Sequence, residues 1–207
     1  MNISLRVALN TSVEQKARLL ALQVAFAQVC NALAPTVQKT RVWNRVALHQ
    51  LMNRSLRERF PEMGSQMVCN AIYSVSRTSR LLFQNPASPF SIARLGSKPL
   101  PLFRYADTCP VYFDRHTLSV KDGQLSMYTL DGRMRFALAL TSPDEATFRQ
   151  KKLREVVLAM RQDGVYELSF QLSTLDEVGQ GEDEPSLSVS VPDKAEIPEY
   201  VMVEEAL

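Results

Sequence analysis

The sequence predicts an α+β protein: a small antiparallel β-barrel of the oligonucleotide-binding kind with a three-helix insertion after its first strand, followed by an acidic tail. Apolar residues recur at helical spacing between about residues 12 and 84, and they alternate with a period of two between about residues 125 and 172. Between these regions, residues 85–110 hold five of the eleven prolines and indicate a linker or extended loop. With 207 residues and 45% hydrophobic content, the chain can bury a substantial core.

The chain is expected to open with a strand at 3–9, in which apolar and polar residues alternate. This alternation is unlike the continuous apolar core of a signal peptide, and no stretch approaches the roughly 20 apolar residues that a membrane span needs. Thr11 and Glu14 have the spacing of a capping box, which predicts a helix over 12–33. Pro35 is expected to end this helix.

Two further helices are predicted at 36–58 and 62–84, and the exposed side of the first is strongly basic. The second has an apolar stripe on one side, while the opposite side carries two cations, three amides and one aromatic ring without any acid. These polar residues are Gln66, Asn70, Tyr73, Arg77, Arg80 and Gln84. Such a face suits phosphates and base edges, and a solvated helix surface is the alternative interpretation.

The β-region is punctuated by Asp-Gly pairs at 122–123, 131–132 and 163–164, which are strong hairpin signals between alternating runs. We expect an antiparallel meander that closes with the first strand into a barrel, because closure removes exposed strand edges. The predicted organisation is a barrel from 1–10 and 100–173, a helical insertion at 11–85, a proline-rich linker at 86–99, and an acidic, partly disordered tail at 174–207 with one possible strand near 187–191.

Charge is divided by position along the chain. Residues 1–161 hold 23 Lys and Arg against 10 Asp and Glu, whereas residues 162–207 hold only Lys194 against 12 acidic residues. A polycationic body gains affinity for phosphates by releasing counterions, so nucleic acid is the first partner class to consider. An acidic tail can shield such a body from non-specific binding.

Signatures of metal binding and catalysis are not found in the sequence. Cys30, Cys69 and Cys109 are odd in number and form no CxxC pair, which indicates neither a disulfide framework nor a zinc ribbon and favours a reducing, cytoplasmic location. His49 and His116 have no Cys or His neighbour at ligand spacing. No GxSxG, Walker or GxGxxG motif occurs. We therefore predict no catalytic residue, metal or cofactor.

Three stretches resemble one family, the transposon-encoded TnpB-like RNA-guided nucleases and the compact type V CRISPR effectors. Residues 56–77 look like a helix pair of that family's recognition lobe. Residues 109–138, which include DRHTLSVKDGQLSMYTLDGR, are similar to its wedge barrel, and residues 153–173 resemble the strands that close that barrel. The resemblance implies that the chain grips a guide RNA scaffold and contacts the short duplex motif beside a double-stranded DNA target.

The chain departs from this family where the RuvC nuclease domain would begin. Asp176 is the nearest candidate for the first metal-binding aspartate, but it lies in TLDEVGQGEDEP, and no further acidic strands follow. Two-metal cleavage needs several convergent carboxylates, so cleavage by this chain alone is not expected. The leading hypothesis is a nuclease-lacking nucleic-acid-binding protein. The alternatives are a subunit of a split nuclease whose RuvC domain is supplied in trans, and an inhibitor or interaction protein acting on an RNA-guided effector.

Candidate nucleic-acid-binding residues combine cations, which hold phosphates, with aromatic and amide groups, which contact bases. On the helical surface they are Arg41, Arg45, Asn70, Tyr73, Arg77 and Arg80. On the barrel and its approaches they are Arg104, Tyr105, Arg115, Arg133, Arg135, Lys151 and Lys152. Tyr73 and Tyr105 are the preferred stacking residues, because Trp43, Phe103 and Phe113 are more typical of a core. Protection of an exposed strand edge is the alternative role of the lysine pair.

Overall fold

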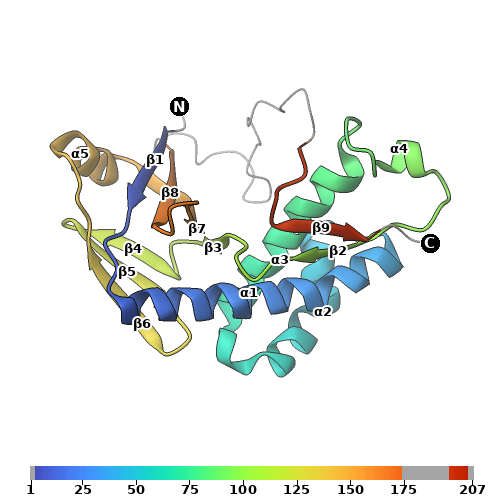
Figure 1. Cartoon of the computed structure of the whole chain (residues 1–207), viewed down its shortest axis with the longest axis horizontal. Helices are drawn as coiled ribbons and strands as arrows, with labels where there is room; N and C mark the ends of the chain where they lie inside the picture. Colours follow the sequence, from blue (N-terminus) through green and yellow to red (C-terminus); the bar gives the residue numbers. More distant parts are fainter. Residues whose placement is uncertain (1–2, 174–195, 205–207) are drawn as a thin grey trace. The chain divides into compact units, whose positions relative to one another are not determined.

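The computed structural model describes residues 3–173 and 196–204, and these fold as an α+β protein with antiparallel sheets (Figure 1). The chain divides into two compact units. A sheet unit contains residues 1–23 and 110–185, and a helical unit contains residues 24–109 and 186–207. The long helix α1 (Val13–Thr40) contributes its first part to the sheet unit and its remainder to the helical unit. The α+β class predicted from the sequence is confirmed.

The sheet unit contains two separate antiparallel sheets. The first has the strand order β1-β8-β7-β3, and the second has the order β4-β5-β6. The strands are β1 (Ile3–Ala8), β3 (Val111–Phe113), β4 (Leu118–Lys121), β5 (Gln124–Thr129), β6 (Gly132–Ala137), β7 (Lys152–Met160) and β8 (Tyr166–Ser173). A helix, α5 (Ser142–Gln150), connects β6 to β7. The expected closed barrel is therefore wrong for the described strands, because no hydrogen-bonded ladder joins the two sheets.

The hairpins follow the local turn signals. Asp122 and Gly123 both have positive φ angles, 49° and 72°, which is the backbone that a two-residue turn between β4 and β5 requires. Strands β5 and β6 pair from Gln124 with Ala137 to Thr129 with Gly132, and β7 pairs with β8 across the Asp163-Gly164 turn. Helix α5 was not anticipated, although Thr141 and Asp144 form a capping box at its start.

The helical unit combines α1 with shorter helices and one small sheet. Its elements are α2 (Arg45–Arg59), the 3₁₀ turn η1 (Pro61–Met63), α3 (Ser65–Ser79), the π-helical turn η2 (Arg80–Gln84), α4 (Ile92–Leu95), β2 (Leu102–Tyr105) and β9 (Val201–Glu204). Strands β2 and β9 pair antiparallel, and Figure 1 shows the red β9 beside the green β2. Residues 102–105, assigned to the barrel from the sequence, thus belong to the helical unit.

Helix α1 differs from its prediction at both ends. Its capping box is formed by Ser12 and Gln15, each side chain bonding the other residue's backbone N–H, one position later than expected. Pro35 lies inside the helix and does not end it. The helix ends only at Arg41, whose φ of 57° is left-handed. Loss of the Pro35 N–H costs a hydrogen bond, and the buried apolar residues around it offset that cost by packing.

By length and composition, α1 is also apolar enough to cross a membrane, contrary to the sequence-based expectation. Length and composition do not distinguish a membrane-spanning helix from the core helix of a soluble protein. In α1, 56% of the most apolar window is buried inside the protein. Leu22, Phe26, Val29 and Leu33 have no exposed surface. Their burial is what a core helix shows.

The helix after α1 begins later than predicted, at Arg45. Asn44 caps it, because its side-chain oxygen accepts hydrogen bonds from the backbone N–H groups of Val46 and Ala47 at 2.9 and 3.2 Å. The helix predicted at 62–84 is interrupted in the structure. Its regular part is α3, preceded by Gly64 with a φ of 70° and followed by the π-helical turn.

The C-terminal region is not only an acidic tail. Val201–Glu204 forms β9, whose Val201 is buried, and Tyr200 stacks on Tyr105 with ring centroids 6.3 Å apart. Residues 174–195, including the possible strand near 187–191, lie outside the described residues. The acidic residues at 174–195 therefore stand between β8 and a second ordered stretch of the chain.

Candidate nucleic-acid interface

The thirteen predicted binding residues are divided between the two units. Arg41, Arg45, Asn70, Tyr73, Arg77, Arg80, Arg104 and Tyr105 belong to the helical unit, whereas Arg115, Arg133, Arg135, Lys151 and Lys152 belong to the sheet unit.

In the helical unit, the structure brings Arg45 and Tyr73 together. Arg45 is the first residue of α2, and its guanidinium carbon lies over the ring of Tyr73, 5.4 Å from the ring centroid. Arg45 is exposed and Tyr73 is half-buried. Because a guanidinium is itself a flat group on which bases stack, the pair presents a cationic stacking surface.

Two predicted residues in this unit are buried, so their predicted roles are wrong in this conformation. Asn70 is 7% exposed and Tyr105 is 3% exposed. The Tyr105 hydroxyl donates a hydrogen bond to the Ser74 carbonyl at 3.2 Å, which fixes the ring against α3. Burial, with a smaller contribution from Cys30, raises the Tyr105 pKa well above its ordinary value. The ring is part of the core and cannot stack on a base.

Several small hydroxyl residues of α3 lie in contact with neighbouring segments. Ser74, Ser76, Thr78 and Ser79 are all buried. Ser76 donates to the Trp43 carbonyl at 2.6 Å and Ser79 donates to the Val75 carbonyl at 2.7 Å. Arg77 and Arg80 are half-buried, and each makes further interactions. The predicted open polar face of this helix is therefore only partly exposed.

Two other predicted cations have structural partners. Arg41 donates from Nη2 to the carbonyls of Gly96 and Lys98, both at 3.1 Å, and so fixes the loop after α4. Arg104 on β2 pairs with Glu204 on β9 at 2.6 Å, with about half of each side chain exposed. Neither sequence periodicity nor charge indicates these partners, because they depend on contacts between distant segments.

In the sheet unit, the β4-β5-β6 sheet has one buried and one solvent-facing side. Alternation places Leu125, Met127, Met134 and Phe136 on the buried side. We call the opposite side the basic face. It comprises Ser119 and Lys121 from β4, Gln124, Ser126 and Tyr128 from β5, and Arg133, Arg135 and Ala137 from β6. No carboxylate belongs to these eight positions.

The cations of the basic face are not paired with acids among the described residues. Arg133 donates from Nε to Ser126 Oγ and from Nη2 to the Ser126 carbonyl, both at 2.9 Å. Arg135 and Lys121 are exposed and have no ion-pair partner in the described part of the chain. Arg115, just before β4, is exposed, and its Nε donates to His116 Nε2 at 3.4 Å. Two carboxylates lie in the turns that adjoin this face: Asp131 is bound by Arg18 at 2.7 Å, and Asp122 follows Lys121 in the β4–β5 turn.

The predicted lysine pair lies where α5 ends and β7 begins. Lys151 caps the C-terminus of α5 and Lys152 is the first residue of β7. Both are half-buried, and Arg154 beside them donates to Ser173 Oγ at 2.7 Å. A lysine at a helix C-terminus is also stabilised by the helix dipole, so this cluster has a structural role as well.

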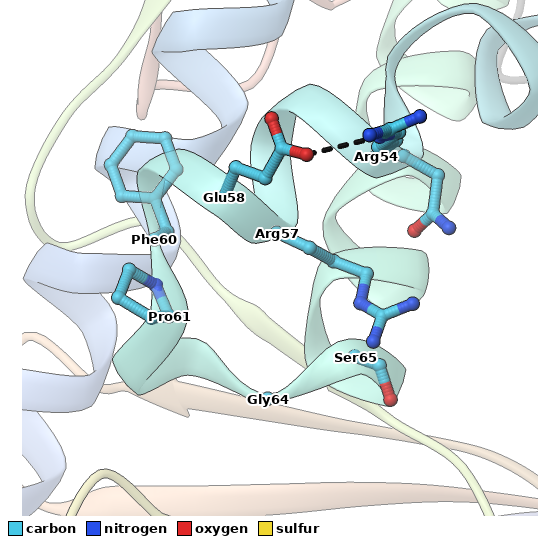
Figure 2. A pocket seen from close by; sticks show the side chains of 8 residues that line it. Arg54, Arg57, Glu58, Phe60, Pro61, Gly64 and Ser65 are labelled. Atoms are coloured by element: carbon cyan, nitrogen blue, oxygen red, sulfur yellow. Dashed lines mark hydrogen bonds and ion pairs between the residues drawn. The ribbon is translucent and has the colours of Figure 1, made fainter.

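A pocket of about 650 Å³ opens between the end of α2 and the start of α3 (Figure 2). Arg54 pairs with Glu58 at 3.0 Å, and Figure 2 shows Arg57 extending toward Ser65. No side chain caps the first N–H groups of α3. The pocket thus joins a helix N-terminus to cations, a combination that suits an anion, although the predicted site did not include it.

The described residues contain no group of three or more His, Cys, Asp or Glu arranged to hold a metal ion. Cys30 and Cys109 are buried free thiols. Burial is the main cause that raises both pKa values, that of Cys109 to about 12. Trp43, Phe83, Phe103 and Tyr105 form a chain of ring contacts with centroids 5.7 to 6.0 Å apart, so the core interpretation of Phe103 is confirmed.

Comparison of the chain with models of known protein families gives no match, and comparison with curated proteins gives none. The resemblance to RNA-guided nucleases therefore rests on the residues quoted above alone.

Proposed function

We propose that this chain is a nucleic-acid-binding protein without nuclease activity of its own, which holds the scaffold of a guide RNA and contacts a double-stranded DNA target in an RNA-guided complex. In this proposal the helical unit corresponds to a recognition lobe and the sheet unit to a wedge-like domain, and the complex acts in the cytoplasm. The sequence resemblance supplies the RNA-guided part of the proposal. The charge distribution supplies the nucleic-acid part.

One observation carries the proposal: several exposed cations have no carboxylate partner among residues 3–173 and 196–204. Arg45 contacts an aromatic ring, Arg133 contacts neutral oxygens, and Arg135 has no ion-pair partner among the described residues. Among the predicted cations, Arg104 pairs with a carboxylate, that of Glu204. Unneutralised cations repel one another, and binding a polyanion relieves that repulsion while releasing its counterions.

The experiment is to purify the protein from its native host, wash at raised salt, and sequence the RNA that remains bound. We expect a single enriched RNA with a constant scaffold next to a variable segment, whose complementarity would identify the DNA target. Heterogeneous RNA that is released at modest salt would contradict the RNA-guided part, and the absence of bound RNA would contradict the proposal as a whole.

A further inference from the structure

We infer that the basic face of the β4-β5-β6 sheet is a platform for a single-stranded RNA segment, with Tyr128 stacking on a base and Arg133, Arg135 and Lys121 holding the phosphates beside it. This inference rests on the proposed function and deepens it, because it assigns one class of ligand to one surface. Tyr128 and Lys121 were not among the residues predicted from the sequence.

The geometry of the face supports this assignment. Arg133 and Arg135 are two residues apart on β6, so they point to the same side at a spacing of about 7 Å. Tyr128 lies directly opposite Arg133, and Ser126 lies opposite Arg135. Between the cations stand only small or neutral side chains, from Ser119, Ser126, Gln124 and Ala137. Apart from Tyr128 and the cations themselves, the face therefore presents no bulky side chain to a ligand.

Arg133 is held in position before any ligand binds. Its hydrogen bonds to Ser126 Oγ and to the Ser126 carbonyl lay the side chain across β5. These partners are neutral, so they orient the guanidinium without cancelling its charge. A cation that is already ordered loses less side-chain entropy on binding than a free one.

The choice of a single strand follows from the aromatic residue. Tyr128 is half-buried and lies on the side of the sheet opposite the buried Leu125 and Met127. An aromatic ring among arginines serves unpaired bases, which stack on it, whereas a duplex keeps its bases stacked on one another and offers mainly phosphates. Protection of the edge strands β4 and β6 by cations is the competing explanation, and it requires no ligand.

The test compares two double variants of equal charge in fluorescence anisotropy titrations of the full chain with a labelled single-stranded RNA of about 12 nucleotides. R133Q/R135Q removes two cations from the basic face. R149Q/R161Q removes two exposed arginines of the same unit that pair with Glu145 and Asp163. We expect the first variant to weaken binding about tenfold and to lower the salt slope by about 1.4, while the second changes affinity less than about twofold.

Single substitutions at Tyr128 test the stacking. Y128F keeps the ring and should bind as the wild type does, whereas Y128L should weaken binding about tenfold, with unchanged circular dichroism and melting temperature showing that both fold. If the two double variants bind equally well, or if an RNA duplex of the same length binds more tightly than the single strand, this inference is wrong while the proposed function stands. If the wild-type chain binds no nucleic acid, the proposed function is contradicted as well.

Discussion

The Asn31 side chain hydrogen-bonds the backbone of Tyr105 in β2, as a neighbouring strand would. From its position on α1, its Nδ2 donates to the Tyr105 carbonyl at 3.0 Å and its Oδ1 accepts the Tyr105 N–H at 2.7 Å. The two bonds satisfy both polar groups of a buried residue. A sequence pattern cannot reveal such a contact, because its partners are far apart in the chain and an Asn on a helix usually faces solvent.

We expect N31A to destabilise the helical unit by about 2 kcal/mol, because it leaves two buried backbone groups without partners. Q38A is the matched control on the same helix, since Gln38 makes one such bond, to the Leu100 carbonyl at 3.1 Å, and should cost about half as much. Urea denaturation measures both values. If N31A and Q38A lowered the free energy of unfolding equally, the second hydrogen bond at Tyr105 would add no stability.

Asp131 in the β5–β6 turn gives the sheet unit a defined dependence on pH. A hydrogen bond from Arg18 and a second from Thr129 lower the pKa of its carboxyl. Because the pKa of Asp131 is lower in the folded state, its carboxylate contributes fully to folding stability above its unfolded-state pKa of about 3.9. This contribution is lost as pH falls through the folded-state pKa. The melting temperature of the wild type should therefore fall more steeply below about pH 5 than that of D131N.

D163N serves as the comparison for this measurement, because Asp163 is also an arginine-paired aspartate in a turn of the same unit. The melting temperature of D163N should fall with decreasing pH as steeply as that of the wild type. If the melting temperatures of the wild type and D131N fell in parallel with decreasing pH, the Arg18 contact would not contribute to stability.

At the scale of elements, the parts fixed by local chemistry were predicted and those fixed by packing were not. Asp-Gly pairs and alternating runs predicted the hairpins β4–β5, β5–β6 and β7–β8, and Asp122-Gly123 itself forms the two-residue turn between β4 and β5. Pro35 misled the prediction of α1, since burial of its neighbours outweighs a lost hydrogen bond. The same distinction applies to the candidate site. Charge predicted Arg45, Arg133 and Arg135 as binding residues, and the structure leaves them exposed, whereas the burial of Asn70 and Tyr105 depends on tertiary contacts.

Strand β9 is expected to stabilise the helical unit well beyond its few residues. Deleting residues 196–207 removes the ladder on β2, the buried Val201 side chain and the ring of Tyr200. We expect a loss of roughly 3 kcal/mol in chemical denaturation, from apolar burial and uncovered backbone groups. The control E204Q breaks only the exposed ion pair with Arg104 and should cost less than about 1 kcal/mol. If the deletion lowered the free energy of unfolding no more than E204Q does, a structural role for β9 would be contradicted.

At the scale of the whole molecule, the basic residues 1–161 are expected to bind nucleic acid and the acidic region after them to shield that binding. Residues 174–195 carry six acids and one lysine, a formal charge of −5, and they join β8 to the described stretch 196–204. These acids are covalently linked to the cations of the same chain. Nucleic acid must compete with them whatever conformation they adopt.

Neutralising these acids without changing the chain length isolates their charge from every other property of the segment. The variant combines D176N, E177Q, E182Q, D183N, E184Q and D193N, which changes the formal charge of residues 174–195 from −5 to +1. We expect about three- to tenfold tighter binding of single-stranded RNA at low salt, and a difference that shrinks as salt screens the interaction. Scrambling the order of residues 174–195 keeps the charge and should leave affinity unchanged, because shielding depends on charge and not on sequence. If the scrambled variant binds RNA as tightly as the neutralised one, a specific contact of this segment, and not its net charge, limits binding.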